Sequence, residues 1–95
     1  MLSPVHPGEV LKEEFMVPLG VSANALARAI HVPPNRVAAI VNGTRGVSAN
    51  TALRLAKVFG TTPNFWLNLQ NAFDLDTARS DLGELELMLL VDGST

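Results

Sequence analysis

Apolar positions recur at helical spacing on either side of two adjacent prolines near the middle of the chain. The inward faces that this spacing predicts are Leu26, Ala27 and Ile30 before the prolines, and Val37, Ile40 and Val41 after them. Ser22 can cap the first helix, Pro34 suits the first turn of the second, and Gly43 suits a left-handed end. The corner falls at His31, where we expect a positive φ, and Ala27 is small enough to let the helices cross closely. This pattern is typical of a helix-turn-helix.

Three further helices are predicted from similar signals, around residues 7–20, 48–60 and from 62 onward. Pro18 and Gly20 are expected to stop the first of them. The expected inward positions are Leu11 and Phe15 in the first; Ala52, Leu53, Leu55, Ala56 and Phe59 in the second; and Phe65, Trp66, Leu69, Ala72 and Phe73 in the third. The aromatic side chains of this third helix have two possible roles, which are packing in the core and forming a dimer face. We expect the indole in the core and Phe73 nearer a two-fold axis. The fold class is therefore all-α, with five helices.

The end of the chain carries a different pattern. Between Gly83 and Gly93, alternating apolar residues suggest a strand, whereas the Leu and Met content suggests a helix. We favour a short strand used in association, because such an apolar segment should pack on its own domain, a dimer mate or another protein. The predicted organisation is a domain over residues 1–80 and an association tail over 81–95.

Length and composition set the class of protein. Ninety-five residues, of which 47% are hydrophobic, make one domain with a modest core and exclude disorder. No apolar run approaches the ~20 residues needed to cross a membrane, and no signal region is seen, so we expect a cytoplasmic protein. The chain has no cysteine, which excludes disulfides, zinc-finger sites and thiol nucleophiles.

The outward side of the helix after the prolines carries the chemistry of interest. The residues opposite its apolar stripe are Asn35, Ala38, Ala39 and Asn42, with Arg36 on the flank. Asn can contact adenine through two hydrogen bonds, and Ala can lie against a thymine methyl group. Thr44, Arg45 and the N–H groups after Gly43 are expected to face phosphate. The pattern favours binding of duplex DNA through the major groove, although a solvated face of an ordinary helical hairpin would look similar.

The distribution of charge supports this interpretation. The net charge is −2, but all nine carboxylates lie in residues 9–14 and 74–92. The segment between them holds no acid and five cations, which are Arg28, Arg36, Arg45, Arg54 and Lys57. A locally basic face on an acidic protein suits salt-dependent phosphate binding. The alternative is that these cations only keep the protein soluble, which their position makes the weaker explanation.

No catalytic constellation is present in the sequence. His6 and Glu9 are three residues apart, but without a second convergent His they indicate a helix start rather than half of a metal site. His31 has no Ser, Cys or acid in a triad-like relation. The loop at residues 42–46 contains glycines but has neither the preceding strand nor the Lys of a nucleotide-binding P-loop. We therefore expect no enzyme activity, no metal and no cofactor.

Four segments together resemble the HigA/VapI antitoxin family of Xre-type helix-turn-helix proteins: residues 6–11, 41–46, 51–56 and 59–70. The last of these is the most specific, and the resemblance covers about residues 6–79. It implies a five-helix, lambda-repressor-like domain that forms a homodimer and binds a palindromic operator in its own promoter. It also implies neutralisation of a HigB-type toxin, a ribosome-dependent mRNA endonuclease. The toxin pairing follows from the resemblance alone.

Residues carried over from the wider repressor pattern complete the candidate DNA-binding set, which is Ala23, Asn24, Pro34, Asn35, Arg36, Ala38, Ala39, Asn42, Thr44 and Arg45. Ala23 and Asn24 match phosphate contacts at the start of the first helix of the pair. Two positions depart from the pattern. His31 replaces a common corner glycine, and Pro34 stands where many repressors place a base-reading side chain. Readout should then shift to Asn35 and Arg36, or depend more on DNA shape.

Three functions remain open at the level of sequence. The first is an antitoxin that also represses its operon. The second is a stand-alone transcription regulator of the same fold, without a toxin partner. The third is a protein-interaction module whose DNA face has decayed. The basic segment, together with Asn35 and Arg36, favours the first two.

Overall fold

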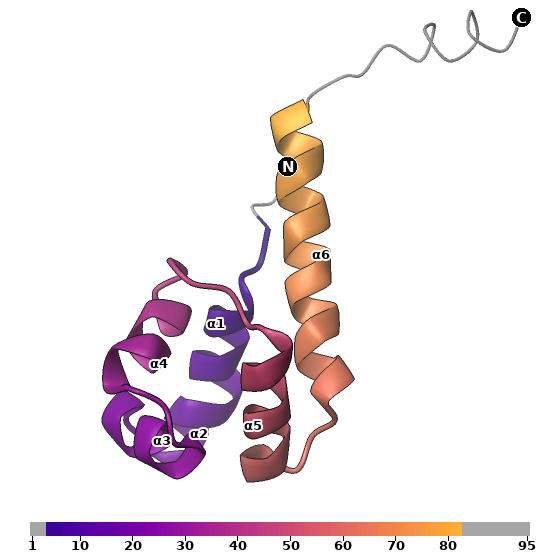
Figure 1. The fold of residues 1–95 in the computed structure, drawn as a ribbon. Helices are drawn as coiled ribbons and strands as arrows, with labels where there is room; N and C mark the ends of the chain where they lie inside the picture. Colours follow the sequence, from indigo (N-terminus) through magenta and orange to yellow (C-terminus); the bar gives the residue numbers. More distant parts are fainter. Residues whose placement is uncertain (1–3, 83–95) are drawn as a thin grey trace, which may run out of the picture.

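The computed structural model describes residues 4–82, and this part of the chain is all-helical (Figure 1). The elements are α1 (Pro7–Val10), the π-helical turn η1 (Leu11–Met16), α2 (Val17–Leu19), α3 (Ala23–Ile30), α4 (Pro34–Val41), α5 (Ala49–Phe59) and α6 (Pro63–Leu82). Because α1, η1 and α2 follow one another without a break, the described residues form the five helical segments that the sequence predicts. The predicted association tail lies outside the described residues, apart from its first two positions, which continue α6.

Polar side chains begin the helices where the sequence places them. The Ala25 N–H donates to Ser22 Oγ at 3.1 Å and starts α3, and the Thr51 N–H donates to Ser48 Oγ at 3.3 Å and starts α5. Each cap satisfies a backbone donor that has no partner inside its helix. The predicted starts at both serines are confirmed.

The first helix ends at Gly20 as predicted, but Pro18 lies within it and does not stop it, so that part of the prediction is wrong. Pro18 lies inside α2, and the helix ends two residues later at Gly20, whose φ of 66° is left-handed. Pro18 has no N–H to donate to the preceding turn, and its ring would crowd that turn in a regular α-helix. The wide π-helical turn η1 comes directly before α2, and a local change of helical pitch is a known way to accommodate such a residue.

The core lies between the α3–α4 pair, the first helix, α5 and the start of α6. Trp66 is fully buried and its Nε1–H donates to Thr61 Oγ1 at 2.8 Å. Phe15 packs against Phe59 and Trp66, with ring centroids 5.0 and 5.1 Å apart. The prediction that the indole belongs to the core is confirmed, and its polar atom is satisfied as a buried indole requires.

The prediction that Leu53 faces inward is wrong, because its side chain is 59% exposed. The buried face of α5 is formed by Thr51, Ala52, Leu55 and Ala56. At about 100° per residue, Leu53 falls well off the middle of that face. Thr51 is buried instead, with its hydroxyl within hydrogen-bond distance of the Ser48 hydroxyl, at 3.2 Å.

Helix α6 leaves the body of the molecule after its first turns and runs on as a single rod (Figure 1). Trp66 is its one fully buried residue, whereas Ala72 is exposed and Phe65 is 37% exposed. The predicted apolar stripe along this helix is therefore only partly inward. Two features explain this: few residues of the body lie beside the far half of α6, and the helix carries polar residues on all sides.

Candidate nucleic-acid interface

The corner between α3 and α4 has the geometry that its sequence predicts. His31 ends α3 with φ 60° and ψ 49°, so the expected left-handed residue is confirmed. The N–H of Val32 then donates to the Ala27 carbonyl at 3.0 Å, which closes the end of α3. Pro33 is extended and Pro34 is the first residue of α4. Ala27 is fully buried, as expected where two helices pack closely.

Helix α4 divides into a buried side and an outward side. Val37 and Ile40 are each 1% exposed and anchor the helix in the core. The exposed candidate residues are Pro34, Asn35, Ala38 and Asn42. Arg36 and Ala39 are half-buried on the flanks. A short helix anchored along one side, with amide and small side chains on the other, has the shape and chemistry to enter a major groove.

The loop after α4 folds back onto the helix. Gly43 has φ 86°, the left-handed conformation expected of it. The N–H groups of Thr44 and Arg45 both donate to the Ala39 carbonyl, at 3.0 and 3.2 Å. The prediction that these N–H groups face phosphate is therefore wrong, because the loop itself uses them. The side chain of Arg45 is exposed and remains the phosphate-binding candidate of the loop.

Asn42 is partly committed to the same loop. Its Oδ1 accepts from the Thr44 N–H at 3.1 Å and lies 2.8 Å from the Thr44 hydroxyl. A side-chain turn of this kind is typical of Asn. The two-bond contact of Asn with adenine needs both Oδ1 and Nδ2. Asn42 therefore keeps only its Nδ2 donor outside these bonds, and Asn35 is the exposed amide of α4, with no hydrogen bond to its side chain seen among residues 4–82.

At the start of α3, Asn24 is exposed and Ala23 is half-buried. The first N–H groups of a helix have no partner within it, and Ser22 satisfies that of Ala25. The N–H groups of Ala23 and Asn24 thus lie at the positive end of α3, which suits a phosphate.

Comparison with known proteins shows the family. A helix-turn-helix family model matches residues 11–66. Virulence-associated protein I of Dichelobacter nodosus is 47% identical over 85 residues, which make up 90% of this chain and 79% of that protein. An addiction module antidote protein of a HigA family from Coxiella burnetii is 55% identical with a TM-score of 0.82, covering 86% of this chain and 89% of that one. Pseudomonas aeruginosa antitoxin HigA, solved with the higBA promoter, is 43% identical with a TM-score of 0.84, covering 88% and 97% respectively.

The chain belongs to the HigA/VapI family of Xre-type helix-turn-helix proteins. The matched range contains α3 and α4 whole, so the pair described above is the family's helix-turn-helix. The resemblance seen in the sequence is confirmed, and so is the lambda-repressor-like, five-helix fold class. Over residues 4–82 of this HigA-family chain, no three His, Asp or Glu side chains gather to hold a metal ion. Likewise, none of the helices described here is long and apolar enough to span a bilayer.

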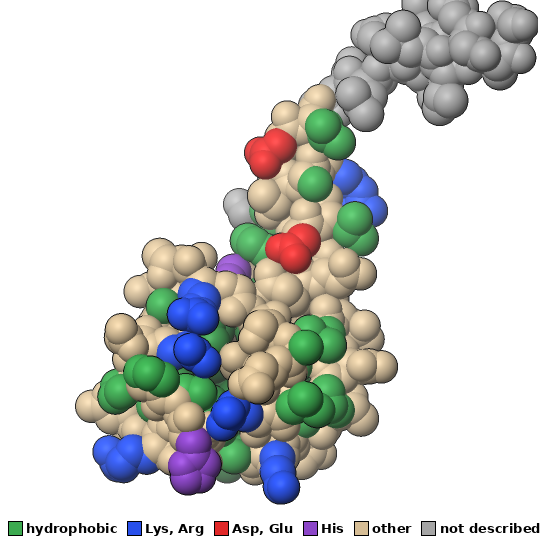
Figure 2. Space-filling model, in the orientation of Figure 1, with side chains coloured by type: hydrophobic (Ala, Val, Ile, Leu, Met, Phe, Trp, Pro, Cys, Tyr) green, Lys and Arg blue, Asp and Glu red, His purple; other side chains and the backbone are tan. Residues whose placement is uncertain are grey.

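The cations of the basic segment do not all serve one face of this HigA-family domain. Figure 2 shows Lys and Arg side chains spread over the body, and acidic side chains on α6. Arg54 donates from Nη1 to the Ile30 carbonyl at 2.7 Å and from Nε to Asn50 Oδ1 at 2.7 Å. It therefore ties α5 to the end of α3 and satisfies an orphan carbonyl there. Arg36 lies on the flank of α4, and Arg45 lies in the loop that follows this helix.

Arg36 has an unusual environment. Its Nε is buried and has no hydrogen-bond partner within the described residues. An unsatisfied buried donor costs free energy, more so on a charged group. Because this atom is inaccessible to solvent, an acceptor on a bound molecule would offset that cost only if the side chain turned outward.

The first turn of α1 supports the end of α4, which sequence reasoning missed. A Cβ at Gly8 would overlap the Ile40 carbonyl oxygen, so only glycine fits there. The Gly8 N–H donates to His6 Nδ1 at 2.9 Å, and the imidazole meets the Phe73 ring edge-on with centroids 4.8 Å apart. Burial lowers the pKa of His6 below 6.5, while the nearby carboxylate of Asp74 acts in the opposite direction. The sequence pattern at His6-Pro7-Gly8 indicates only a helix start.

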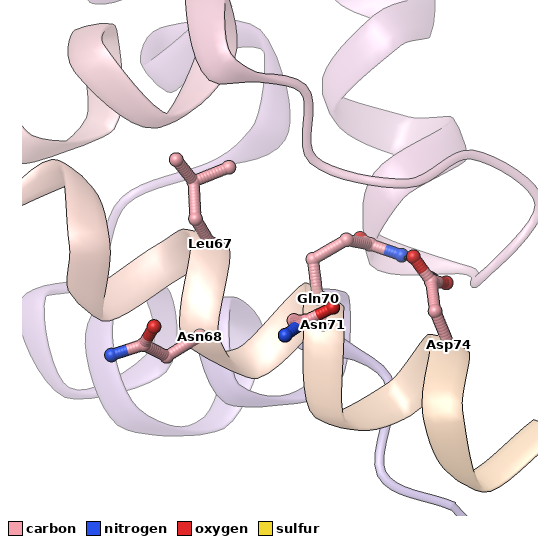
Figure 3. A pocket seen from close by; sticks show the side chains of 5 residues that line it. All are labelled: Leu67, Asn68, Gln70, Asn71 and Asp74. Carbon is pink, nitrogen blue, oxygen red and sulfur yellow. Dashed lines mark hydrogen bonds between the residues drawn. The ribbon is translucent and has the colours of Figure 1, made fainter.

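Helix α6 also holds the loop after α4. The Val47 N–H donates to Gln70 Oε1 at 2.7 Å, and Gln70 Nε2 donates to Asp74 Oδ1 at 2.9 Å. Gln70 and Asp74 line a shallow cavity of about 340 Å³ on α6, together with Leu67, Asn68 and Asn71 (Figure 3). Sequence reasoning missed the contact between Val47 and Gln70, because the two partners are 23 residues apart.

Proposed function

We propose that this chain is a DNA-binding antitoxin that represses its own promoter as a homodimer and neutralises a HigB-type mRNA endonuclease. The observation that carries the proposal is the exposed polar side of α4, in a chain 43% identical to an antitoxin HigA that was solved with its promoter. The anchored Val37 and Ile40 give the helix a rigid base from which to read DNA.

On this proposal, α4 lies in the major groove. Asn35 provides the two-bond amide contact to a base, and Ala38 lies against a thymine methyl group or lets the helix approach closely. The Arg36 side chain then turns outward to an acceptor on the DNA, which would give its unpartnered Nε a hydrogen bond. Pro34 contributes shape rather than a hydrogen bond, because its side chain has no polar atom.

Phosphate contacts on either side of α4 would fix its position in the groove. The N–H groups of Ala23 and Asn24 meet one strand at the start of α3, and the Arg45 side chain meets the other side of the groove. The hydrogen bond from the Thr44 hydroxyl to Asn42 Oδ1 shapes the loop that carries Arg45. Contacts of this kind give affinity without sequence preference and depend on salt.

Dimerisation places two copies of α4 on the two halves of a palindromic site. We assign the interface to an exposed seam on α6, whose members follow one another at spacings of four and three residues: Asn64, Asn68, Asn71, Leu75, Ala78 and Leu82. This is the spacing of helix-pair seams. Leu75 is 47% exposed and Leu82 61% exposed, and a second copy of α6 would cover both. Phe73 lies on the opposite side of α6 from this seam, half-buried against His6, so the seam does not include it.

The test combines DNA binding and toxin capture. DNA from upstream of the gene should be retarded by the protein at lower concentration than a shuffled sequence of equal length. Co-expression with the neighbouring reading frame should give a complex that co-purifies and should rescue growth. Retardation without a partner would instead identify a stand-alone regulator. Absence of sequence-selective retardation would reject the repressor role. A protein with the proposed function acts in the bacterial cytoplasm, on the nucleoid when bound to its operator.

A further inference from the structure

The loop between α4 and α5, residues 42–48, is held at two points. Near its start, the Ala39 carbonyl accepts from the N–H groups of Thr44 and Arg45. Near its end, the Val47 N–H donates to Gln70 Oε1 at 2.7 Å. Arg45 stands between these two points. The hydrogen bond to Gln70 joins this loop to α6, a helix that begins 15 residues after residue 48.

The fit around Gln70 is close and directional. Gly46 passes over the amide group so tightly that a Cβ there would lie 2.9 Å from Gln70 Oε1. Val47 is buried at 4% exposure, so its N–H has little access to water. A carboxylate has acceptors and no donor, and Asp74 Oδ1 accepts from Gln70 Nε2 at 2.9 Å. This bond turns Oε1 toward the loop, as the close view of the α6 side chains indicates (Figure 3).

We infer that Gln70 is a positioning residue for DNA binding: it holds residues 45–47 so that the Arg45 guanidinium meets a phosphate. The inference rests on the proposed DNA-binding function and adds a residue that lies outside the helix-turn-helix. Without the bond at Val47, the second half of the loop loses its fixed end. Arg45 then has to be ordered at the moment of binding, which costs conformational entropy.

The primary variant is Gln70→Met, which keeps the length of the side chain and removes both hydrogen bonds. Binding to operator and to non-specific DNA should weaken alike, by about tenfold at 0.1 M salt for each phosphate that Arg45 no longer neutralises. The slope of log affinity against log salt should fall by about one per subunit. The double variant Arg45→Ala with Gln70→Met should have the same salt slope as Arg45→Ala alone.

A matched variant restores both hydrogen bonds and reverses the direction of the one between positions 70 and 74. In the double variant Gln70→Glu with Asp74→Asn, the new carboxylate accepts from the Val47 N–H and from the new amide, and the total charge is unchanged. This variant should recover the wild-type salt slope. Gly46→Ala provides an independent route, because its φ is not left-handed and the three atoms nearest to its new methyl group all belong to the Gln70 amide. It should reproduce the smaller slope even if Gln70→Met does not fold.

The outcomes separate the inference from the function on which it rests. If the wild-type protein retards no DNA, the proposed function fails. If the wild type binds but folded Gln70→Met and Gly46→Ala keep its salt slope, Gln70 has no positioning role, even where their thermal midpoints fall. Failure of the charge-matched double variant to restore the slope would also overturn the inference.

Discussion

The backbone of Gly8 lies directly against the carbonyl oxygen of Ile40, so the start of α1 braces the last turn of α4. Ile40 is 1% exposed, and its side chain anchors α4 in the core. The orientation of the outward side of α4 thus depends on a contact with a helix that begins 27 residues before it in the sequence. This contact leads to the first prediction.

Gly8→Ala should lower the free energy of unfolding by about 1–3 kcal/mol, because overpacking at a close backbone contact forces a shift of one element. The shift should also move α4 and weaken operator binding more than non-specific binding. Thermal denaturation and band-shift titrations measure the two effects. Lys12→Ala, at an exposed position of η1 directly after α1, is the control and should stay within about 0.5 kcal/mol of wild type. A stable Gly8→Ala protein with wild-type operator affinity would contradict the bracing role.

Stability should depend on the protonation of His6. Its Nδ1 must be unprotonated to accept from the Gly8 N–H, and burial lowers its pKa in the folded state. The unfolded chain therefore binds the proton more tightly, so this contribution is complete above the unfolded pKa of 6.5 and is lost as pH falls below it. The Asp74 carboxylate opposes the shift and limits its size.

Thermal midpoints measured between about pH 5.5 and 7.5 check this dependence. His6→Asn keeps an oxygen that can cap α1 but does not titrate, so its stability should vary less across that window. If wild type and His6→Asn follow the same pH curve, the imidazole is not the group responsible.

The double variant Asn35→Ala with Arg36→Ala should abolish operator-specific retardation. Asn35 is exposed and Arg36 is half-buried, so the fold should keep nearly its wild-type thermal midpoint. Arg79→Ala removes a cation on α6 and should leave retardation unchanged. Unaltered operator binding by the double variant would remove both residues from the reading role.

Two arginines of the basic segment should behave in opposite ways. Arg45→Ala should weaken binding to all DNA sequences alike and reduce the salt slope by about one per subunit, with little change in stability. Arg54→Met should lower the free energy of unfolding by about 1–3 kcal/mol, because the Ile30 carbonyl loses its charged donor, and the folded protein should keep its salt slope. Denaturation curves and salt titrations on both variants distinguish the roles. A sequence-selective loss in Arg45→Ala would mean that Arg45 contacts a base.

The sequence predicted what depends on neighbours along the chain. Caps at Ser22 and Ser48, the left-handed corner at His31 and the two faces of α4 all follow from local rules of spacing and backbone conformation. Candidate DNA contacts at Asn35 and Arg45 follow from the outward face and remain predictions. Counting charges could not show that Arg54 is used inside the fold, because its partner carbonyl is 24 residues away.

The misassigned positions have a common origin. Periodicity identifies an apolar face but not its width, so it places Leu53 inside and leaves Thr51 out. It also cannot show where a helix leaves the body, which is why the expected stripe on α6 is only partly buried. Gly8 and Gln70 carry no periodic signal at all, since each matters through a single contact between distant segments.

The exposed seam of α6 gives the last prediction. Leu75→Glu with Leu82→Glu places two like charges where each copy would meet its mate, and an exposed helix tolerates such changes in a monomer. Sedimentation should show a shift from dimer to monomer at micromolar concentration, with the helical content retained. Affinity for the full operator should then fall toward that for a half-site, because the two reading helices are no longer joined. Leu53→Glu, which adds the same charge at an exposed leucine of α5, should leave the dimer intact. A dimer that survives both changes on α6 would place the interface elsewhere on the molecule.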